Sequence, residues 1–216
     1  AAGLLNTDWG DNGHMQPLPV SYLGYMAGAG LSWNAEMALS RAELTTMLHR
    51  FAFADAAGVM GEVAYDLGNV YRLVGIEPSN ASALFLILLN PERSADEGPF
   101  ADLTRDALAI TRDRILEIRD RLSAADMARA DADLVIREFT WAADILAWAA
   151  ELGMARLEHG AAETSASLPS EVREPLAQEL EGLVERHRDL WLRRSRAGGL
   201  SDSARRLERV IEVLKG

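Results

Sequence analysis

Four side chains near the start of the chain have the types and spacing of a ligand-binding loop: Asp8, Trp9, Asp11 and His14. An indole offers a flat apolar face to the C–H face of a sugar ring, and a carboxylate two residues later accepts hydrogen bonds from neighbouring hydroxyl groups. The pattern predicts these four residues to be substrate-binding residues of a carbohydrate site. The alternative is a plain turn, in which Asp8 bonds its own backbone and Trp9 only packs.

A short apolar pair, Leu4–Leu5, precedes the loop and predicts a strand that ends where the polar residues begin. In barrel and open α/β enzymes the working residues follow the C-terminal ends of strands, so the loop is placed as a site would be. A lone strand has no neighbours to satisfy its backbone groups. We therefore expect residues 4–9 to be irregular here, or to pair with another copy of the chain.

The loop leads through two prolines into a helix that is predicted to start at Ser21 and run to Trp33. Glycine and alanine leave one side of this helix nearly bare. Such a face lets another backbone come close, although the same glycines also weaken a helix. We favour close packing.

Everything that follows has the periodicity of amphipathic helices. A capping box, Ser40 with Glu43, starts one helix, and apolar residues spaced three and four apart predict the others. The fold class predicted is all-α, a helical bundle of long antiparallel helices, preceded by an extended N-terminal segment. The predicted helices cover residues 40–51, 59–74, 81–89, 103–122, 134–157, 176–190 and 201–214.

Two tryptophans of the longest predicted helix, Trp141 and Trp148, lie seven residues apart on one face. A ligand platform is conceivable, but large aromatic residues at helical spacing are typical of a bundle core. His187 falls on the apolar stripe of its helix and has no second ligand at i+4. It is read as a buried or boundary histidine with a hydrogen-bond partner.

Composition excludes several classes of function. The 216 residues carry a net charge of -11, which disfavours nucleic acid as a partner. The chain has no cysteine, hence no disulfide and no thiolate zinc site, and no cluster suggests another metal or a cofactor. The uncharged runs at residues 20–33 and 81–89 are too short to span a bilayer, so no membrane partner is expected. Nothing indicates a compartment.

The first 34 residues resemble the last strand and last helix of the (β/α)8 barrel in family 20 glycoside hydrolases, the β-N-acetylhexosaminidases and their relatives. The motif Trp9–Gly10–Asp11 is similar to the Trp-Gly-Glu that ends the eighth strand in that family. The helix pattern Ala-x-Ala-Glu-x-x-Trp is matched at both alanines and at Trp33. Aspartate replaces the glutamate of the loop, Gly30 replaces that of the helix, and the usual Pro-Arg pair is absent.

The resemblance implies two domains: residues 1–34 as the end of a catalytic barrel, with its last strand, site loop and last helix, and residues 35–216 as an all-helical C-terminal domain. It implies that Trp9 lines the subsite for the non-reducing sugar and that Asp11 binds the outer hydroxyls of that sugar. In the family an Asp-Glu pair on an earlier strand does the chemistry, with the acetamido group of the substrate as nucleophile. This chain has no candidate for that pair, so it contains no catalytic residue and is predicted to be inactive alone.

We therefore expect the C-terminal fragment of a glycoside hydrolase acting on (N-acetyl)hexosaminides or related glycosides. Its partners would be a carbohydrate substrate in the full-length protein, the missing N-terminal barrel and, in a homo-oligomer, a second copy of the chain. The alternative is a stand-alone, non-catalytic helical module for interaction or oligomerisation, in which the N-terminal loop is a docking arm.

Overall fold

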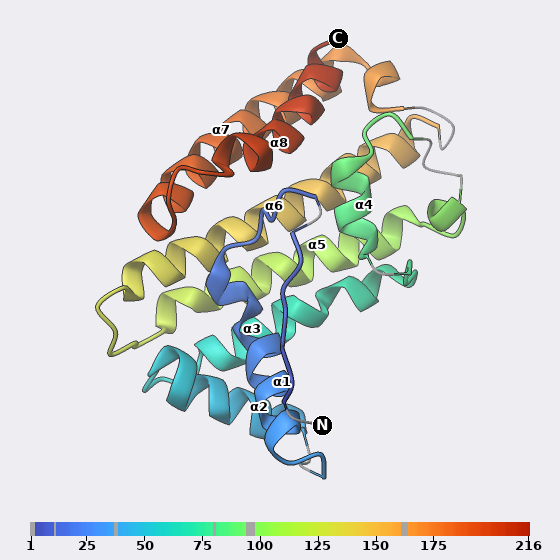
Figure 1. Cartoon of the computed structure of the whole chain (residues 1–216). Helices are drawn as coiled ribbons and strands as arrows, with labels where there is room; N and C mark the ends of the chain where they lie inside the picture. The colour runs from blue at the N-terminus through green and yellow to red at the C-terminus, as the bar shows by residue number, and fades with distance from the viewer. Residues whose placement is uncertain (1–2, 11, 37–38, 80, 94–97, 161–163) are drawn as a thin grey trace.

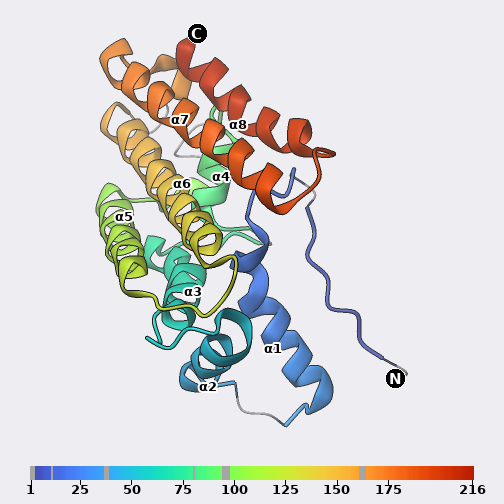
Figure 2. The ribbon, with the colours of Figure 1, turned by 90° about the vertical axis from the view of Figure 1, so that its left-hand side faces the viewer.

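Four long amphipathic helices form an up-and-down bundle, as Figures 1 and 2 show. The computed structural model describes residues 3–10, 12–36, 39–79, 81–93, 98–160 and 164–216. Short connections join the four helices, so each runs back along the one before it. The all-α prediction is confirmed, and the closing segment is a full bundle helix of 16 residues. The four are α5 (Arg105–Asp120), α6 (Ala132–Glu158), α7 (Ser170–Arg194) and α8 (Leu200–Lys215).

Shorter helices lie beside α5 and α6, some packed on these two helices directly and others packed on one another (Figure 1). Their ends follow from local sequence. The hydroxyl of Ser40 accepts the backbone N–H of Glu43, whose carboxylate accepts the Ser40 N–H, so the predicted capping box is formed. Gly75 adopts a left-handed conformation with φ 80°, which ends the helix predicted over residues 59–74. These elements are α2 (Arg41–Met47), the π-helix η2 (Leu48–Phe53), α3 (Met60–Asn69), the 3₁₀ helix η3 (Val70–Val74) and α4 (Ala83–Leu89).

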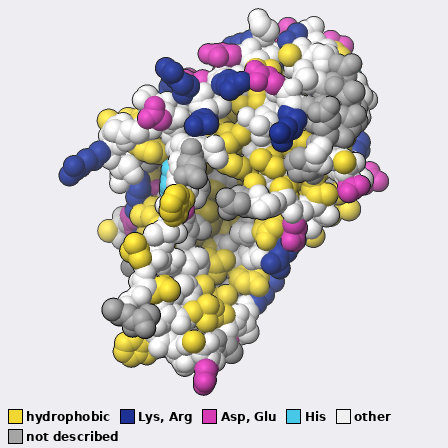
Figure 3. Space-filling model, turned by 45° about the vertical axis from the view of Figure 1, so that its right-hand side comes forward, with side chains coloured by type: hydrophobic (Ala, Val, Ile, Leu, Met, Phe, Trp, Pro, Cys, Tyr) yellow, Lys and Arg dark blue, Asp and Glu magenta, His cyan; other side chains and the backbone are white. Residues whose placement is uncertain are grey.

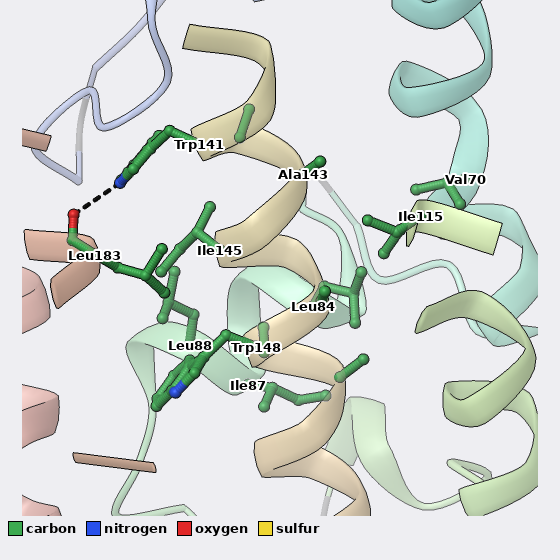
Figure 4. Packing of buried hydrophobic residues seen from close by; sticks show 14 of the residues in the cluster. Val70, Leu84, Ile87, Leu88, Ile115, Trp141, Ala143, Ile145, Trp148 and Leu183 are labelled. Atoms are coloured by element: carbon green, nitrogen blue, oxygen red, sulfur yellow. Dashed lines mark hydrogen bonds between the residues drawn. The ribbon is translucent and has the colours of Figure 1, made fainter. Parts of the chain in front are cut away.

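The core lies around α6, which passes between α5 and α7 (Figure 1). Figure 4 shows Trp141 and Trp148 pointing from α6 toward α7, with Leu84 and Ile87 of α4 on another side of the helix. Both tryptophans are buried, at 2% and 1% exposure, so the core interpretation is confirmed. Gly153 lets α4 approach, because a Cβ there would lie 3.0 Å from the Ile87 side chain. Three 3₁₀ turns complete the connections: η4 (Gly98–Phe100), η5 (Arg121–Ala124) and η6 (Ser165–Ser167).

The N-terminal segment leaves the bundle and lies along helix α1 (Tyr22–Trp33), which projects from the body of the protein (Figure 2). Residues 3–10 are extended without forming a strand, so the expectation of an irregular segment is confirmed. A 3₁₀ turn, η1 (Leu18–Ser21), connects the loop to α1, and Tyr22 packs against Phe53 with ring centroids 5.9 Å apart. No residue of α1 is buried, and Trp33 is 94% exposed. The part of the chain described contains no β-strand.

Candidate functional site

The bare face of α1 receives the extended segment through one side chain, that of Asn6. Its Nδ2 donates to the carbonyl oxygens of Gly24 and Tyr25, each at 3.3 Å. A Cβ on Gly28 would lie 2.2 Å from the same nitrogen, so glycine is required for this approach. The close approach of another backbone that was predicted for this face is not seen: the contact is the Asn6 side-chain amide, and no residue of α1 is buried.

Trp9 presents its indole to solvent. The residue is 77% exposed, and Nε1 donates to the hydroxyl of Thr7 at 2.9 Å. This bond uses the polar edge of the indole within its own segment. The ring face is free to stack on a ligand, in the manner that a sugar-binding tryptophan requires.

Asp8 points the other way and holds the loop closed. Its Oδ2 accepts the hydroxyl of Ser21 at 2.5 Å and lies 3.4 Å from Nε2 of His14, while Oδ1 accepts the Gln16 amide at 3.4 Å. Ser21 stands directly before α1, so this carboxylate ties the loop to the helix that follows it. Asp8 and His14 therefore lie together in the loop.

The loop turns through residues with left-handed backbone. Gly13 has φ 94° and donates its N–H to the Gly10 carbonyl at 3.0 Å, and His14 has φ 48°, unusual for a residue with a side chain. A Cβ on Gly13 would lie 3.1 Å from Cα of Ser203 in α8. The loop is thus seated on the bundle. Asp11, the other predicted ligand residue, lies outside the described residues.

A buried ionic network, which sequence reasoning missed, lies next to this loop. Both carboxylate oxygens of Glu138, 1% exposed, accept from Arg194, at 2.9 and 2.6 Å. Arg194 also donates to Asp131 at 2.8 Å, and Arg129 reaches the same carboxylate at 2.9 Å. The Arg129 and Arg194 guanidinium groups hold the pKa of Asp131 well below its ordinary value. Hydrogen bonding to Glu138 raises the pKa of Arg194.

The signal for this network was present in the sequence. Glu138 lies three residues before Trp141 and seven before Ile145, on an apolar stripe where a lone carboxylate is costly. Arg194 follows Leu190 by four residues and His187 by seven, on the stripe that faces it. A charge on each of two facing apolar stripes indicates a buried ion pair.

His187 is buried as predicted, with 2% exposure, and it has the expected partner. Its ring stacks on Trp141 with centroids 4.9 Å apart, and Nε2 lies 2.9 Å from the hydroxyl of Ser203. Burial, aided by the charge of Arg188, lowers the pKa of His187 to about 4. The imidazole is therefore neutral at pH 7. Among the residues described, no group of three or more acidic or histidine side chains is arranged to hold a metal ion.

Two cavities flank the loop. The larger, about 400 Å³, is an apolar hollow between the loop and α3, α4 and α6, and uncharged side chains such as Tyr71, Phe85 and Leu146 line it. Figure 3 shows hydrophobic side chains gathered around a hollow on this face. The smaller, about 200 Å³, lies between residues 14–18 and the C-terminal end of α7. Met15 and Gln16 line both cavities.

No helix in the described ranges is long and apolar enough to cross a bilayer. No family model, no curated protein and no solved structure matches this chain.

Proposed function

We propose that this chain is the C-terminal portion of a glycoside hydrolase acting on (N-acetyl)hexosaminides or related glycosides, and that it contributes a sugar-binding loop but not the catalytic acid. The observation that carries the proposal is the state of Trp9, whose ring face is open to solvent while Asp8 fastens the loop behind it. A tryptophan held in this way is pre-arranged to stack on a pyranose ring.

The geometry of the segment also supports the proposal. An extended stretch, a polar loop and a helix that returns along the stretch follow one another in the order of the last β/α unit that the family resemblance implies, although the stretch is not a strand here. Leu4 and Leu5, at 69% and 85% exposure, would be covered by neighbouring barrel strands. In this assignment residues 1–34 complete the barrel, and Asp11 supplies the carboxylate for the sugar hydroxyls. The barrel would carry the acid and the acetamido-assisted step.

The test is to express an N-terminally extended protein that includes the barrel and to assay aryl N-acetylhexosaminides and other aryl glycosides. We expect Trp9→Ala and Asp11→Ala each to lower kcat/KM by about tenfold or more, because stacking and hydroxyl recognition are lost. Phe51→Ala, at another exposed aromatic residue outside the loop, is the control. Unchanged turnover in both loop variants would remove Trp9 and Asp11 from the site.

A second function is favoured by one observation, the exposed apolar side chains of the N-terminal arm and α1. Leu4, Leu5, Leu31 and Trp33 are 43% to 94% exposed, as expected for a docking arm of a non-catalytic interaction or oligomerisation module. Sedimentation of the chain separates the two functions. The interaction or oligomerisation module would be favoured by a concentration-dependent dimer that dissociates in Leu5→Glu, together with a full-length gene that lacks a barrel.

A further inference from the structure

The smaller cavity has one wall from the N-terminal loop and one wall from the helical bundle. His14, Gln16 and Leu18 line the loop side, and Trp191 and Ser195 stand on the bundle side at the end of α7. Its volume is about 200 Å³. The His14 ring that lines it lies 3.4 Å from the Asp8 carboxylate, and Asp8 precedes Trp9, so the cavity is next to the loop that carries the candidate sugar site.

Two contacts fix the loop wall in place. Asp8 binds Ser21 and lies beside His14, and Gly13 packs its backbone against Ser203. His14 is held in a left-handed conformation at this point, with its ring at the cavity. Strain of this kind persists only where the surroundings determine it, and it is frequent at binding sites.

The bundle wall combines an aromatic ring with polar groups whose charges already cancel. Trp191 is partly exposed and its Nε1 donates to the Arg196 carbonyl at 2.7 Å, which anchors the ring. Arg194 and Glu138 also line the cavity, and they bind each other through two hydrogen bonds. A free anion would have to compete with Glu138 for Arg194, and a free cation would have to compete with Arg194 for Glu138.

An aromatic ring together with amide, imidazole and hydroxyl groups, and no unpaired charge, suits a neutral polyhydroxylated ligand. We propose that this cavity is a second carbohydrate-binding position, which holds a sugar residue attached to the one that Trp9 binds. The inference rests on the proposed function and deepens it. The substrate class becomes a glycan of at least two neutral sugar residues, and the helical bundle becomes part of the binding site.

This assignment gives the bundle a place in recognition. The loop with Trp9 belongs to the N-terminal segment, whereas the opposite wall of the cavity comes from α6 and α7, more than 120 residues later. Neither part encloses the cavity alone. Affinity for a longer glycan thus depends on both, while a glycosyl fluoride, whose leaving group is a single atom, uses the first position only.

The test fills the cavity without removing a packed residue. Ser195 is exposed at its rim, and its φ of -131° suits any side chain, so Ser195→Trp places an indole across the opening. Leu192→Trp is the matched control, because Leu192 is also exposed near the end of α7 but does not line the cavity. Circular dichroism and thermal unfolding establish that both variants fold.

The binding readout uses the 216-residue chain and the β-1,4-linked trisaccharide of N-acetylglucosamine, with the monosaccharide in parallel. In ¹⁵N spectra we expect the Trp9 indole signal to move with both sugars and the Trp191 signal to move, saturably, with the trisaccharide alone. Ser195→Trp should abolish the shift of Trp191, and Leu192→Trp should keep it. In the extended enzyme, Ser195→Trp should lower the ratio of kcat/KM for trisaccharide over glycosyl fluoride by about tenfold.

The outcomes separate the two proposals. If Trp9 responds but Trp191 does not, or if the ratio is the same in Ser195→Trp and the wild type, the second position is overturned and the sugar loop stands. If neither indole responds to any sugar and the extended protein hydrolyses none, the proposed function fails, and the second position fails with it.

Discussion

The indole nitrogen of Trp141 donates a hydrogen bond to the carbonyl oxygen of Leu183 at 2.8 Å. Trp148 repeats the bond with Leu176 at 3.0 Å, seven residues forward on α6 and seven residues back on α7. The two bonds have the same register, as antiparallel helices require. Each also satisfies a polar group that the bundle buries, so the tryptophans fix the axial position of α7 on α6.

Replacement of Trp141 by phenylalanine should therefore lower the free energy of unfolding by more than the smaller ring alone would. The variant loses the hydrogen bond to Leu183 and part of a stacked ring, and we expect the free energy of unfolding to fall by about 2 kcal/mol. Urea unfolding measures the change. The same substitution at Trp33, which is 94% exposed, should change stability by less than about 0.5 kcal/mol. Equal effects at the two positions would contradict the role of the bond.

His187 makes stability depend on pH. Its folded-state pKa of about 4 lies below the ordinary value of 6.5, so the unfolded chain binds a proton first as the pH falls. The contribution of the neutral His187 to the free energy of unfolding is complete above pH 6.5 and is lost as the pH falls from 6.5 to 4. From pH 7 to pH 5 we expect His187 to account for a loss of about 2 kcal/mol. His187→Gln should remove that part of the slope, and His159→Gln, at an exposed histidine, should leave it.

The bundle could be predicted because its determinants are local. Apolar residues at helical spacing define α5, α6 and α7, and the pair Ser40 and Glu43 makes the bonds that the motif predicts. The π-helix after α2 carried no such signal. It ends at Ala54 with φ 49°, where the buried Asp55 carboxylate accepts the backbone N–H groups of Met60 and Asp126. Asp126 is distant in sequence, so local periodicity could not indicate this junction.

The candidate site was predicted in part for the same reason. Trp9 and Asp8 were identified by residue type and spacing within a short loop. Neither the contact of Gly13 with Ser203 nor the place of Trp191 opposite His14 has a local signal, because each joins residues far apart in the chain. Which carboxylates are engaged within the loop also depends on the loop conformation. Asp8 turns toward Ser21, which its sequence position does not reveal.

Breaking the ion pair of Glu138 and Arg194 should strongly lower the free energy of unfolding, whereas replacing both residues by apolar side chains should lower it much less. Glu138→Gln removes the buried partner of Arg194 and leaves it only Asp131, a carboxylate that it shares with Arg129, and we expect a loss of about 3 kcal/mol. The double variant Glu138→Leu with Arg194→Met removes both charges and should recover most of that stability, while Arg129 still pairs with Asp131. A double variant as unstable as the single one would show that the network acts through geometry and not through charge.

Arg156 is a buried residue whose replacement should stabilise the protein. It is 1% exposed, and its Nε and Nη2 have no hydrogen-bond partner within the described ranges, while Nη1 reaches only the Asn90 carbonyl at 3.5 Å. Because burial penalises an unpaired charge, Arg156→Met should raise the free energy of unfolding by about 1–2 kcal/mol. Arg105→Met, which breaks an exposed pair with Glu158, is the control. A loss of stability in Arg156→Met would show that this guanidinium makes stabilising interactions, contrary to its lack of partners for Nε and Nη2 among the described residues.

Two glycines of α1 test how the extended segment is held. Alanine at either position should favour the helix by up to about 1 kcal/mol. At Gly24 a Cβ meets nothing within 4 Å, so Gly24→Ala should show that gain in urea unfolding. At Gly28 the Cβ would collide with the Asn6 amide, so Gly28→Ala should displace it and shift its side-chain NH₂ resonances toward those of a solvated asparagine. Alanine stabilises the helix in both variants, so urea unfolding alone does not test the Asn6 contact. The Asn6 resonances provide that test. Unchanged Asn6 resonances in Gly28→Ala would mean that the segment does not depend on this contact.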